Sequence, residues 1–342
     1  MMRYEIPHDD LGPIRALTGE VAAGHRDVED DDLIGLAATY AQELPRGLRR
    51  FLNSLRLDEP AAACVIAGYP VDDERIGPTP AHWLERPWRG QTLELEVFFL
   101  LCACLLGDPI AWSTQQDGRI MHDVLPIRTH EWEQLGSGSR ETLTWHTEEA
   151  FHPVRADYIG LMCLRNPDKV ETTYATMDEV ALSPEIAGIL REPVFPIRPD
   201  RSHLPANRGA GGNGGKRAEL TERCYAWIAA MDADPAPVAV LHGADDRPYL
   251  RADPFFMDMV QADARAAGAL AELCRQVDTS LKGYALAPGE VLFLDNYRAV
   301  HGRRAFQARF DGTDRWLKRL NVARDLRKSR DRRESAGSRV IY

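Results

Sequence analysis

The sequence has few cysteines, and their spacing suits neither a disulfide framework nor a zinc knuckle. Its six cysteines include no Cys-x-x-Cys pair, and most of them lie in apolar runs: Cys64, Cys102, Cys104, Cys163, Cys224 and Cys274. Cysteine pairs at short, regular spacing mark disulfide-rich secreted domains and structural zinc sites. We therefore expect reduced thiols in the core of a cytoplasmic protein.

Long apolar runs and an excess of positive charge are missing as well. The longest apolar stretch, 97–106, is too short to cross a bilayer, and the N-terminus lacks an apolar signal core. The formal net charge of -10 argues against nucleic acid and against an anionic membrane as partners. With 342 residues, 44% of them hydrophobic, and no internal repeat, the chain can bury a sizeable core as one unit.

The hydrophobic pattern predicts mainly helices up to residue 106 and a mixture of strands and helices beyond it. Apolar residues recur every three or four positions over 30–57, where Pro45 divides two helices, and 92–106 is a predicted buried helix. The segment 72–89, rich in proline and charge, is a predicted surface loop. Further helices are predicted at 178–190, 218–231, 261–281 and 324–333. Strands are predicted at 61–67, 110–115, 121–126, 158–164, 172–177 (a neighbour of 158–164), 238–241, 249–252, 290–295 and 316–322.

The most informative stretch is 143–152, which contains the pattern His146-x-Glu148. On a strand, side chains two residues apart point to the same face, so this imidazole and this carboxylate would lie side by side. They are two of the three ligands of the 2-His-1-carboxylate triad, which binds non-haem Fe(II) and leaves positions open for chemistry. The best candidate for the third ligand is His301, which follows an apolar strand late in the chain.

Other histidines carry no such pattern. His152 lies six positions after His146, and we predict a structural role for it. The sequence assigns no role to His122, His130, His203 or His242.

Several segments resemble the clavaminate-synthase-like Fe(II)/2-oxoglutarate oxygenases: 143–153, 160–166, 295–303 and Arg315. Within that family, the likeness is greatest to bacterial arginine, enduracididine and asparagine 3-hydroxylases of peptide-antibiotic biosynthesis. The resemblance covers about residues 95–342 and implies an α+β fold with a distorted double-stranded β-helix (jelly roll) core and surrounding helices.

The resemblance also implies how the chain is divided. We expect a single domain over 1–342, with a mainly helical part at 1–94 and the jelly-roll core at 95–342. The Gly-rich segment 205–217 lies outside the family pattern. It is predicted to be flexible, either as a surface insertion or as a lid over substrate.

For the cofactors, the resemblance implies Fe(II) bound by His146, Glu148 and His301. 2-Oxoglutarate would chelate the iron, and O2 would take the remaining position. Arg315 would hold the far carboxylate of the cosubstrate, because the planar guanidinium suits a bidentate contact. Thr172 is a candidate for a further hydrogen bond to the cosubstrate.

The substrate implied by the resemblance is a free amino acid. Gln115 and Glu148 would face its α-amino group, and Arg319 would bind its α-carboxylate. Leu135 and Ser137 belong to the loop that would close on these main-chain atoms.

The side-chain end of the substrate would meet Asp253. A carboxylate there favours a cationic or amide-bearing side chain such as a guanidinium. Some arginine hydroxylases have a second acid two residues later, where this sequence has Phe255. This departure leaves arginine itself open and keeps cyclic guanidino amino acids such as enduracididine among the candidates.

The reaction expected from this reading is hydroxylation at C3 of arginine or a related guanidino amino acid, giving succinate and CO2. Desaturation or C4 hydroxylation of arginine, citrulline or lysine would use the same site. Two other classes also stay open: a non-catalytic metal-binding or sugar-binding jelly roll, and a zinc-dependent hydrolase or isomerase. The sequence does not decide whether the chain forms a homodimer.

Overall fold

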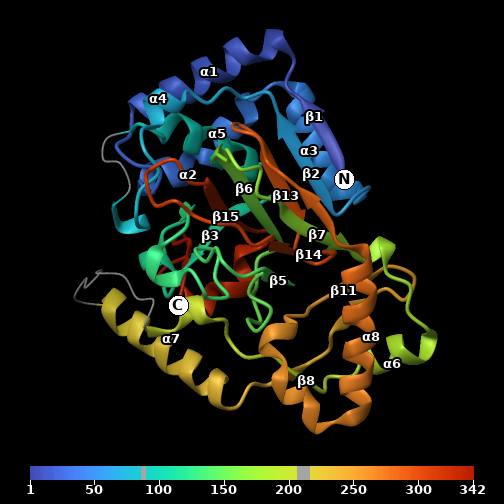
Figure 1. The fold of residues 1–342 in the computed structure, drawn as a ribbon. Coiled ribbons are helices and arrows are strands. Elements are labelled where there is room, and N and C mark those ends of the chain that lie inside the picture. The colour runs from blue at the N-terminus through green and yellow to red at the C-terminus, as the bar shows by residue number, and fades with distance from the viewer. Residues whose placement is uncertain (86–89, 206–215) are drawn as a thin grey trace.

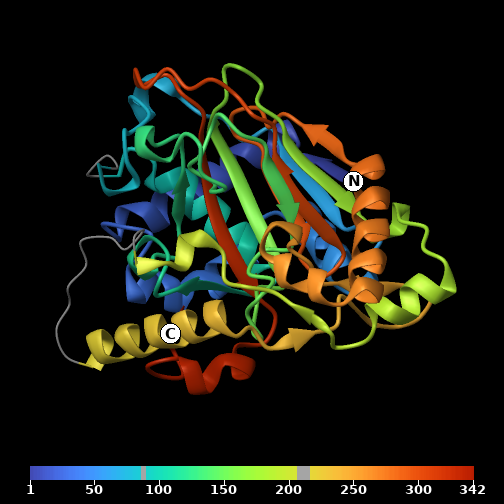
Figure 2. The ribbon, with the colours of Figure 1, turned by 60° about the horizontal axis from the view of Figure 1, so that its bottom comes forward.

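The computed structural model describes residues 1–85, 90–205 and 216–342. Two β-sheets lie between the N-terminal helices on one side and the helices α6, α7 and α8 on the other (Figure 1). The turned view shows α8 along one flank of the strands and α7 beside the C-terminal segment (Figure 2). The Gly-rich segment predicted at 205–217 falls largely on 206–215, which lie outside the described residues.

The larger sheet is mostly antiparallel, with parallel pairs only at its two ends, β1–β2 and β3–β16, within the described chain. Its strands, in order, are β1 (Met2–Glu5), β2 (Ala63–Ala67), β13 (Val291–Asp295), β6 (Tyr158–Arg165), β15 (Trp316–Ala323), β3 (Asp108–Trp112) and β16 (Val340–Ile341), with β4 (His122–Val124) also paired to β15. The smaller sheet has the order β12 (Lys282–Tyr284), β7 (Thr172–Thr176), β14 (Ala299–Arg303) and β5 (Leu143–His146). Two further pairs are β8 (Phe195–Pro196) with β9 (Pro237–Val238), and β10 (Leu241–Gly243) with β11 (Pro248–Leu250).

The helices fall into an N-terminal group and a later group. The α-helices are α1 (His8–Ala23), α2 (Asp31–Tyr40), α3 (Arg46–Asp58), α4 (Asp73–Ile76), α5 (Leu93–Cys104), α6 (Pro184–Leu190), α7 (Lys216–Ala233) and α8 (Ala264–Ser280). Short 3-10 helices are η1 (Ala41–Glu43), η2 (Trp83–Glu85), η3 (Gln116–Gly118), η4 (Arg128–His130), η5 (Met177–Glu179), η6 (Arg201–His203), η8 (Pro254–Phe256), η9 (Asp258–Ala262) and η10 (Leu326–Arg332).

The helix α5 is buried nearly all round, as its continuous apolar sequence predicts. It packs on the larger sheet, and its one deeply buried acid, Glu96, lies 2.7 Å from the Lys318 ammonium of β15. The same ammonium lies 2.5 Å from Asp123 of β4, which also accepts a hydrogen bond from the indole of Trp316. Lys318 therefore faces α5, and its neighbour Arg319 faces the opposite side of β15.

Most predicted elements are confirmed in kind and place. Pro45 separates η1 from α3, and the predicted helices at 92–106, 218–231 and 261–281 are α5, α7 and α8. The mixture of helices and strands confirms the α+β class. In the described part of the chain, no helix is both long enough and apolar enough to cross a bilayer.

Some predictions of secondary structure were wrong. Residues 72–85 of the predicted loop 72–89 are not simply a loop, because Asp72 accepts hydrogen bonds from the Glu74 and Arg75 amides and so starts α4. The remaining residues, 86–89, lie outside the described part of the chain. The helix predicted at 178–190 is η5 followed by a separate α6, which Ser183 caps. The segment predicted at 324–333 as a helix is the 3-10 helix η10.

The pairing predicted for 172–177 was also wrong. The strand β7 is not a neighbour of β6. It lies in the smaller sheet between β12 and β14. This correction matters for the site, because β14 carries His301 and β7 carries Thr172.

Candidate active site

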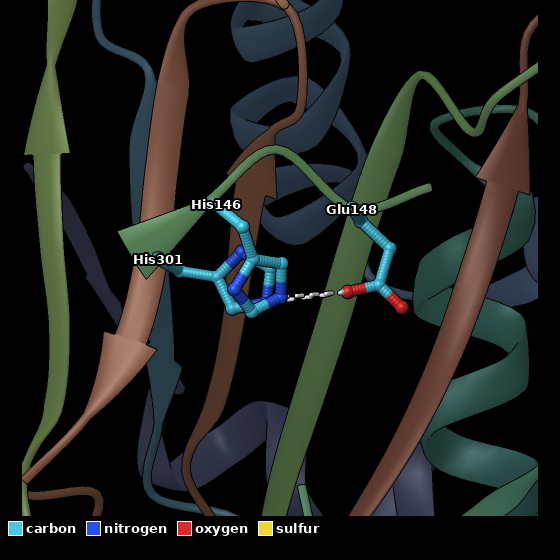
Figure 3. A group of neighbouring side chains, drawn as sticks. All are labelled: His146, Glu148 and His301. Atoms are coloured by element: carbon cyan, nitrogen blue, oxygen red, sulfur yellow. Dashed lines mark ion pairs between the residues drawn. The ribbon is translucent and has the colours of Figure 1, made fainter. Parts of the chain in front are cut away.

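The three predicted metal ligands meet at one place. His146 ends β5 and pairs directly with His301 of β14, so their rings lie side by side with centroids 4.5 Å apart. Glu148 Oε2 lies 3.6 Å from His146 Nε2 and 3.3 Å from His301 Nε2. Figure 3 shows the Glu148 carboxylate turned toward the two imidazoles. Two nitrogens and one carboxylate oxygen within 4.8 Å of one another form a set that could hold a metal ion.

Glu148 does not reach this position as part of the strand, contrary to the prediction. β5 ends at His146, and the chain then turns, with Glu149 in the left-handed region at φ 53°. The Thr147 amide donates to the Ala252 carbonyl, and the Glu148 amide donates to Asn296 Oδ1. This turn brings the Glu148 carboxylate back to the two rings and sends the side chain of Glu149 to other partners.

The charges around the three ligands suit a cation. Burial raises the pKa of Glu148, but Arg319, His146 and His301 hold it well below its usual range, so the carboxylate is ionised. Burial lowers the pKa of His146, but Glu148 and Asp253 outweigh it and raise that pKa to about 9. His146 Nδ1 lies 2.9 Å from the Thr144 carbonyl, to which only an N–H can donate, so Nε2 is the nitrogen left for a metal.

Arg315 faces the same cavity from just before β15. It is buried, and its Nη2 donates to Thr172 Oγ1 over 3.2 Å, while its Nε has no hydrogen-bond partner. No ion pair joins it to an acid within the described ranges, and burial lowers its pKa to about 10. Thr172 and Arg315 are thus together, as predicted, and they offer an anion both a cation and a hydroxyl.

A second buried arginine, Arg303, lines this wall and was missed by the sequence reasoning. It lies two residues after His301 on β14, and it donates to the backbone carbonyls of Gly138 and Glu141. Burial and the charge of Arg315 lower its pKa to about 9. The sequence signal for Arg303 was its place inside the segment 295–303, which resembles the oxygenase family. That Arg303 faces the cavity is shown by the fold alone.

The residues predicted for the main-chain end of a substrate are also together. Arg319 donates to Glu148 Oε1 over 2.6 Å and to Gln115 Oε1 over 3.0 Å. Leu135 lines the same cavity as the metal ligands and also a second cavity that adjoins it, whereas Ser137 lines the second cavity alone. Arg319 thus forms hydrogen bonds with both predicted partners of the α-amino group, and the Ser137 hydroxyl lies 2.8 Å from His130 Nδ1.

Asp253 lines the same cavity as the three predicted metal ligands. It is 8% exposed, and burial raises its pKa to about 7. Phe255 is more exposed and contributes an apolar edge. Asp200 lines the same cavity from a distant segment and also raises the pKa of Asp253. The sequence contained no signal for Asp200, because only the fold brings it near Asp253.

A second polar cluster lies next to Gln115, and the sequence analysis did not predict it. His203 is fully enclosed, with its Nε2 against Glu149 and its Nδ1 2.6 Å from Thr114 Oγ1. The Gln115 amide donates to Glu149 Oε1 over 2.8 Å and so belongs to the same network. His152 is buried against Trp112, with ring centroids 4.3 Å apart, which agrees with its predicted structural role.

The sequence of the chain matches known proteins along its whole length. The model of the family described as taurine catabolism dioxygenase TauD, TfdA family matches residues 230–321. An enduracididine beta-hydroxylase of Streptomyces hygroscopicus is 47% identical over 342 residues, and an L-ornithine/L-arginine 3-hydroxylase of Catenulispora acidiphila is 44% identical over 343 residues; each comparison covers 100% of both chains. The chain belongs to the TauD/clavaminate-synthase-like iron- and 2-oxoglutarate-dependent oxygenases.

The fold of this oxygenase is that of a solved relative. The non-heme iron oxygenase OrfP, crystallised in complex with Fe, succinate and (3S)-hydroxy-L-Arg, is 42% identical, with a TM-score of 0.92 and 100% of both chains covered. The expected family resemblance is therefore confirmed. The oxygenase brings all the predicted site residues to two adjoining cavities, with Ser137 in the second one.

Proposed function

We propose that this oxygenase hydroxylates C3 of a free guanidino amino acid, L-arginine or a cyclic relative such as enduracididine, with formation of succinate and CO2. The observation that carries the proposal is one cavity lined by three sets of residues: the His146, Glu148 and His301 group, Arg315, which has no acidic partner among the described residues, and the acids Asp200 and Asp253. The activities for which the two relatives are named, beta-hydroxylation and 3-hydroxylation, support the position of attack.

His146, Glu148 and His301 would hold Fe(II), since the two nitrogens and the ionised carboxylate are the donor set that this ion takes in oxygenases. With 2-oxoglutarate and O2, the bound iron supplies the oxidation of an unactivated C–H bond, coupled to loss of CO2 from the cosubstrate. The far carboxylate of 2-oxoglutarate would be held by Arg315 and the Thr172 hydroxyl. The protein itself binds, orients and desolvates the reacting groups.

The substrate would be held at both ends. Arg319 would bind the α-carboxylate, and Gln115 and Glu148 would face the α-ammonium group. To do so, Arg319 must give up part of its present contacts with Glu148 and Gln115. At the far end, the Asp253 carboxylate would accept hydrogen bonds from the guanidinium, and the nearby Asp200 adds a second negative charge.

The rest of the proposal concerns the fold and its setting. We propose that the two sheets are the faces of a distorted jelly roll and that 1–342 form a single domain, with a helical part at 1–94. The first 94 residues also supply β1 and β2 to the larger sheet. A cytoplasmic location is consistent with six free thiols.

The test is a succinate-release screen with purified protein, Fe(II), ascorbate and 2-oxoglutarate. We expect succinate with arginine or enduracididine and little with citrulline, lysine or asparagine. Mass spectrometry of the product separates hydroxylation, which adds an oxygen, from desaturation, which removes two hydrogens. Release of no succinate with any of these amino acids would overturn the proposal, and activity retained with Zn(II) alone would point to a hydrolase or isomerase.

A further inference from the structure

The carboxamide of Gln115 is held in one orientation by the residues around it. Arg319 Nη2 lies 3.0 Å from one of its two outer atoms, and a guanidinium can only donate, so this atom is the oxygen, Oε1. The nitrogen, Nε2, donates to Glu149 Oε1 over 2.8 Å and to Ser202 Oγ over 2.6 Å. The oxygen of Gln115 therefore faces Arg319, and the nitrogen faces Glu149 and Ser202.

The Ser202 hydroxyl can serve Gln115 only as an acceptor. Its single hydrogen is donated to Asp200 Oδ1, which also accepts from the Ser202 amide over 2.8 Å. His203 Nε2 is 3.2 Å from the same Gln115 nitrogen, but it is bonded to the Glu149 carboxylate. Rotation of the carboxamide would turn its oxygen toward the Glu149 and Ser202 oxygens and its nitrogen toward Arg319, so these partners oppose it.

With both hydrogens of its nitrogen in use, Gln115 can offer a substrate only its oxygen. An amide oxygen accepts two hydrogen bonds, and among the described residues Arg319 supplies one of them. The same guanidinium donates to Glu148 Oε1 over 2.6 Å, so the acceptors of Gln115 and Glu148 lie against one cation. Two acceptors placed in this way suit an ammonium group, which a rotated carboxamide would meet with N–H donors instead.

We propose that Ser202 is a positioning residue, whose hydroxyl keeps the Gln115 oxygen turned toward the α-ammonium group of the substrate. The inference rests on the proposed function and deepens it, because it gives the site a means of selecting an α-amino acid over a guanidino acid without the amino group. Ser202 and Asp200 line the same cavity as Gln115. The hydroxyl thus connects a residue that would meet the guanidinium with one that would meet the amino group.

The first measurement is the affinity for arginine of the complex with Zn(II) and 2-oxoglutarate, which does not turn over, by titration calorimetry. We expect Ser202→Ala to raise Kd about 3- to 10-fold, because the Gln115 nitrogen loses one of its two acceptors. Ser202→Thr keeps the hydroxyl and should lose clearly less. The control Thr279→Ala removes an exposed hydroxyl of α8, which bonds to the Arg275 carbonyl, and should leave Kd unchanged. An unchanged Kd in Ser202→Ala, or equal losses with alanine and threonine, would overturn the proposal.

An analogue shows which end of the substrate Ser202 serves. 5-Guanidinopentanoate is arginine without the α-amino group, and it keeps the guanidinium that would meet Asp200. We expect wild type and Ser202→Ala to bind this analogue equally, since the interaction that the substitution weakens is missing in both complexes. A loss as large as with arginine would show that Ser202 acts through Asp200 or through the fold, and it would contradict the proposal.

A double-mutant cycle on the protein tests whether Ser202 acts through Gln115. Once Gln115 is alanine, Ser202→Ala should weaken arginine binding little further, so the two losses should not add. Losses that add in full would mean that the two residues are independent and would refute the inference. A wild-type protein that binds no guanidino amino acid would refute the proposed function itself, whereas tight binding that Ser202→Ala does not change would refute the role of Ser202 alone.

Discussion

Arg315 carries a buried positive charge that no acidic side chain neutralises in the described part of the molecule. Its unpaired Nε and its contact with Thr172 point to an anion as the missing partner. We expect Arg315→Met to raise the KM for 2-oxoglutarate roughly 10- to 100-fold, since a hydrogen bond to a charged group contributes about 1.5–3 kcal/mol.

The KM of Arg315→Lys for 2-oxoglutarate should lie between those of the wild type and Arg315→Met, because lysine keeps the charge but loses the planar guanidinium. Steady-state kinetics at varied 2-oxoglutarate would measure both variants. Arg304→Met is the control, since Arg304 is exposed and pairs with Glu171 at the surface. An unchanged KM in Arg315→Met would remove Arg315 from the cosubstrate site.

Asp253 gives a prediction on pH. Burial raises the pKa of its carboxyl to about 7, so the group loses its charge as the pH falls through that value. A neutral carboxyl attracts a guanidinium weakly, so the KM for arginine should rise as the pH is lowered from about 8 to about 6. Asp253→Asn should have a higher KM throughout and a flatter profile. If the KM for 2-oxoglutarate followed the same curve, the titrating group would not be at the substrate's side-chain end.

At the scale of single residues, the sequence prediction depended on local motifs. His146 and Glu148 are two residues apart, and His301 and Arg315 lie in or near a recognisable late segment. Asp200 and His203 belong to no recognisable motif. They lie at the site because the fold places their segment against Gln115.

The interface between α5 and the larger sheet depends on buried charges. Glu96 and Asp123 share the Lys318 ammonium, which is completely enclosed. Removing one partner of such a group leaves an uncompensated buried charge, so we expect Glu96→Ala to lower the free energy of unfolding by about 3–5 kcal/mol. Glu94→Ala on the same helix should cost less than about 1 kcal/mol, because Glu94 pairs with Arg75 near the surface. Denaturant unfolding measures both, and similar losses would mean that the buried group contributes no more than a surface pair.

Hydrogen bonds from Arg303 connect β14 to the loop before β5. Arg303 donates to the Gly138 and Glu141 carbonyls, and the Phe306 amide donates to the Ser139 carbonyl nearby. We expect Arg303→Met to speed amide hydrogen exchange over 127–139, including the Ser139 amide, which bonds to the Glu131 carbonyl. Arg304→Met should leave exchange unchanged. Unaltered protection in Arg303→Met would show that the loop does not depend on this contact.

Two errors of the sequence prediction at the scale of elements, the pairing of β7 and the end of β5, share one cause. The alternating pattern of 172–177 predicted a strand correctly but could not say that its neighbours are β12 and β14. Likewise, the end of β5 at His146 depends on hydrogen bonds from Thr147 and Glu148 to distant residues. Pairing and termination follow from long-range contacts, which a local pattern does not contain.

The metal-ligand group joins β14 to the turn that follows β5, so metal binding should stabilise the whole molecule. At a concentration 100 times Kd, a ligand adds about 2.7 kcal/mol to the free energy of unfolding. We therefore expect Mn(II), used in place of Fe(II), to raise Tm by several degrees, and EDTA to reverse the rise. His301→Ala should abolish the shift. His203→Gln should retain it, because Glu149, Asp200 and His203 already bond to one another. A shift that persists in His301→Ala would place the metal elsewhere.

The final strand, β16, lies alongside β3, and the Ser113 amide donates to the Ile341 carbonyl over 2.8 Å. Gln115 stands only two positions further on. Removal of the residues from Val340 onward would leave β3 as an exposed edge strand, prone to aggregation, and would loosen the segment that carries Gln115. Protein engineers who trim or extend this terminus should thus look for altered turnover as well as poorer solubility.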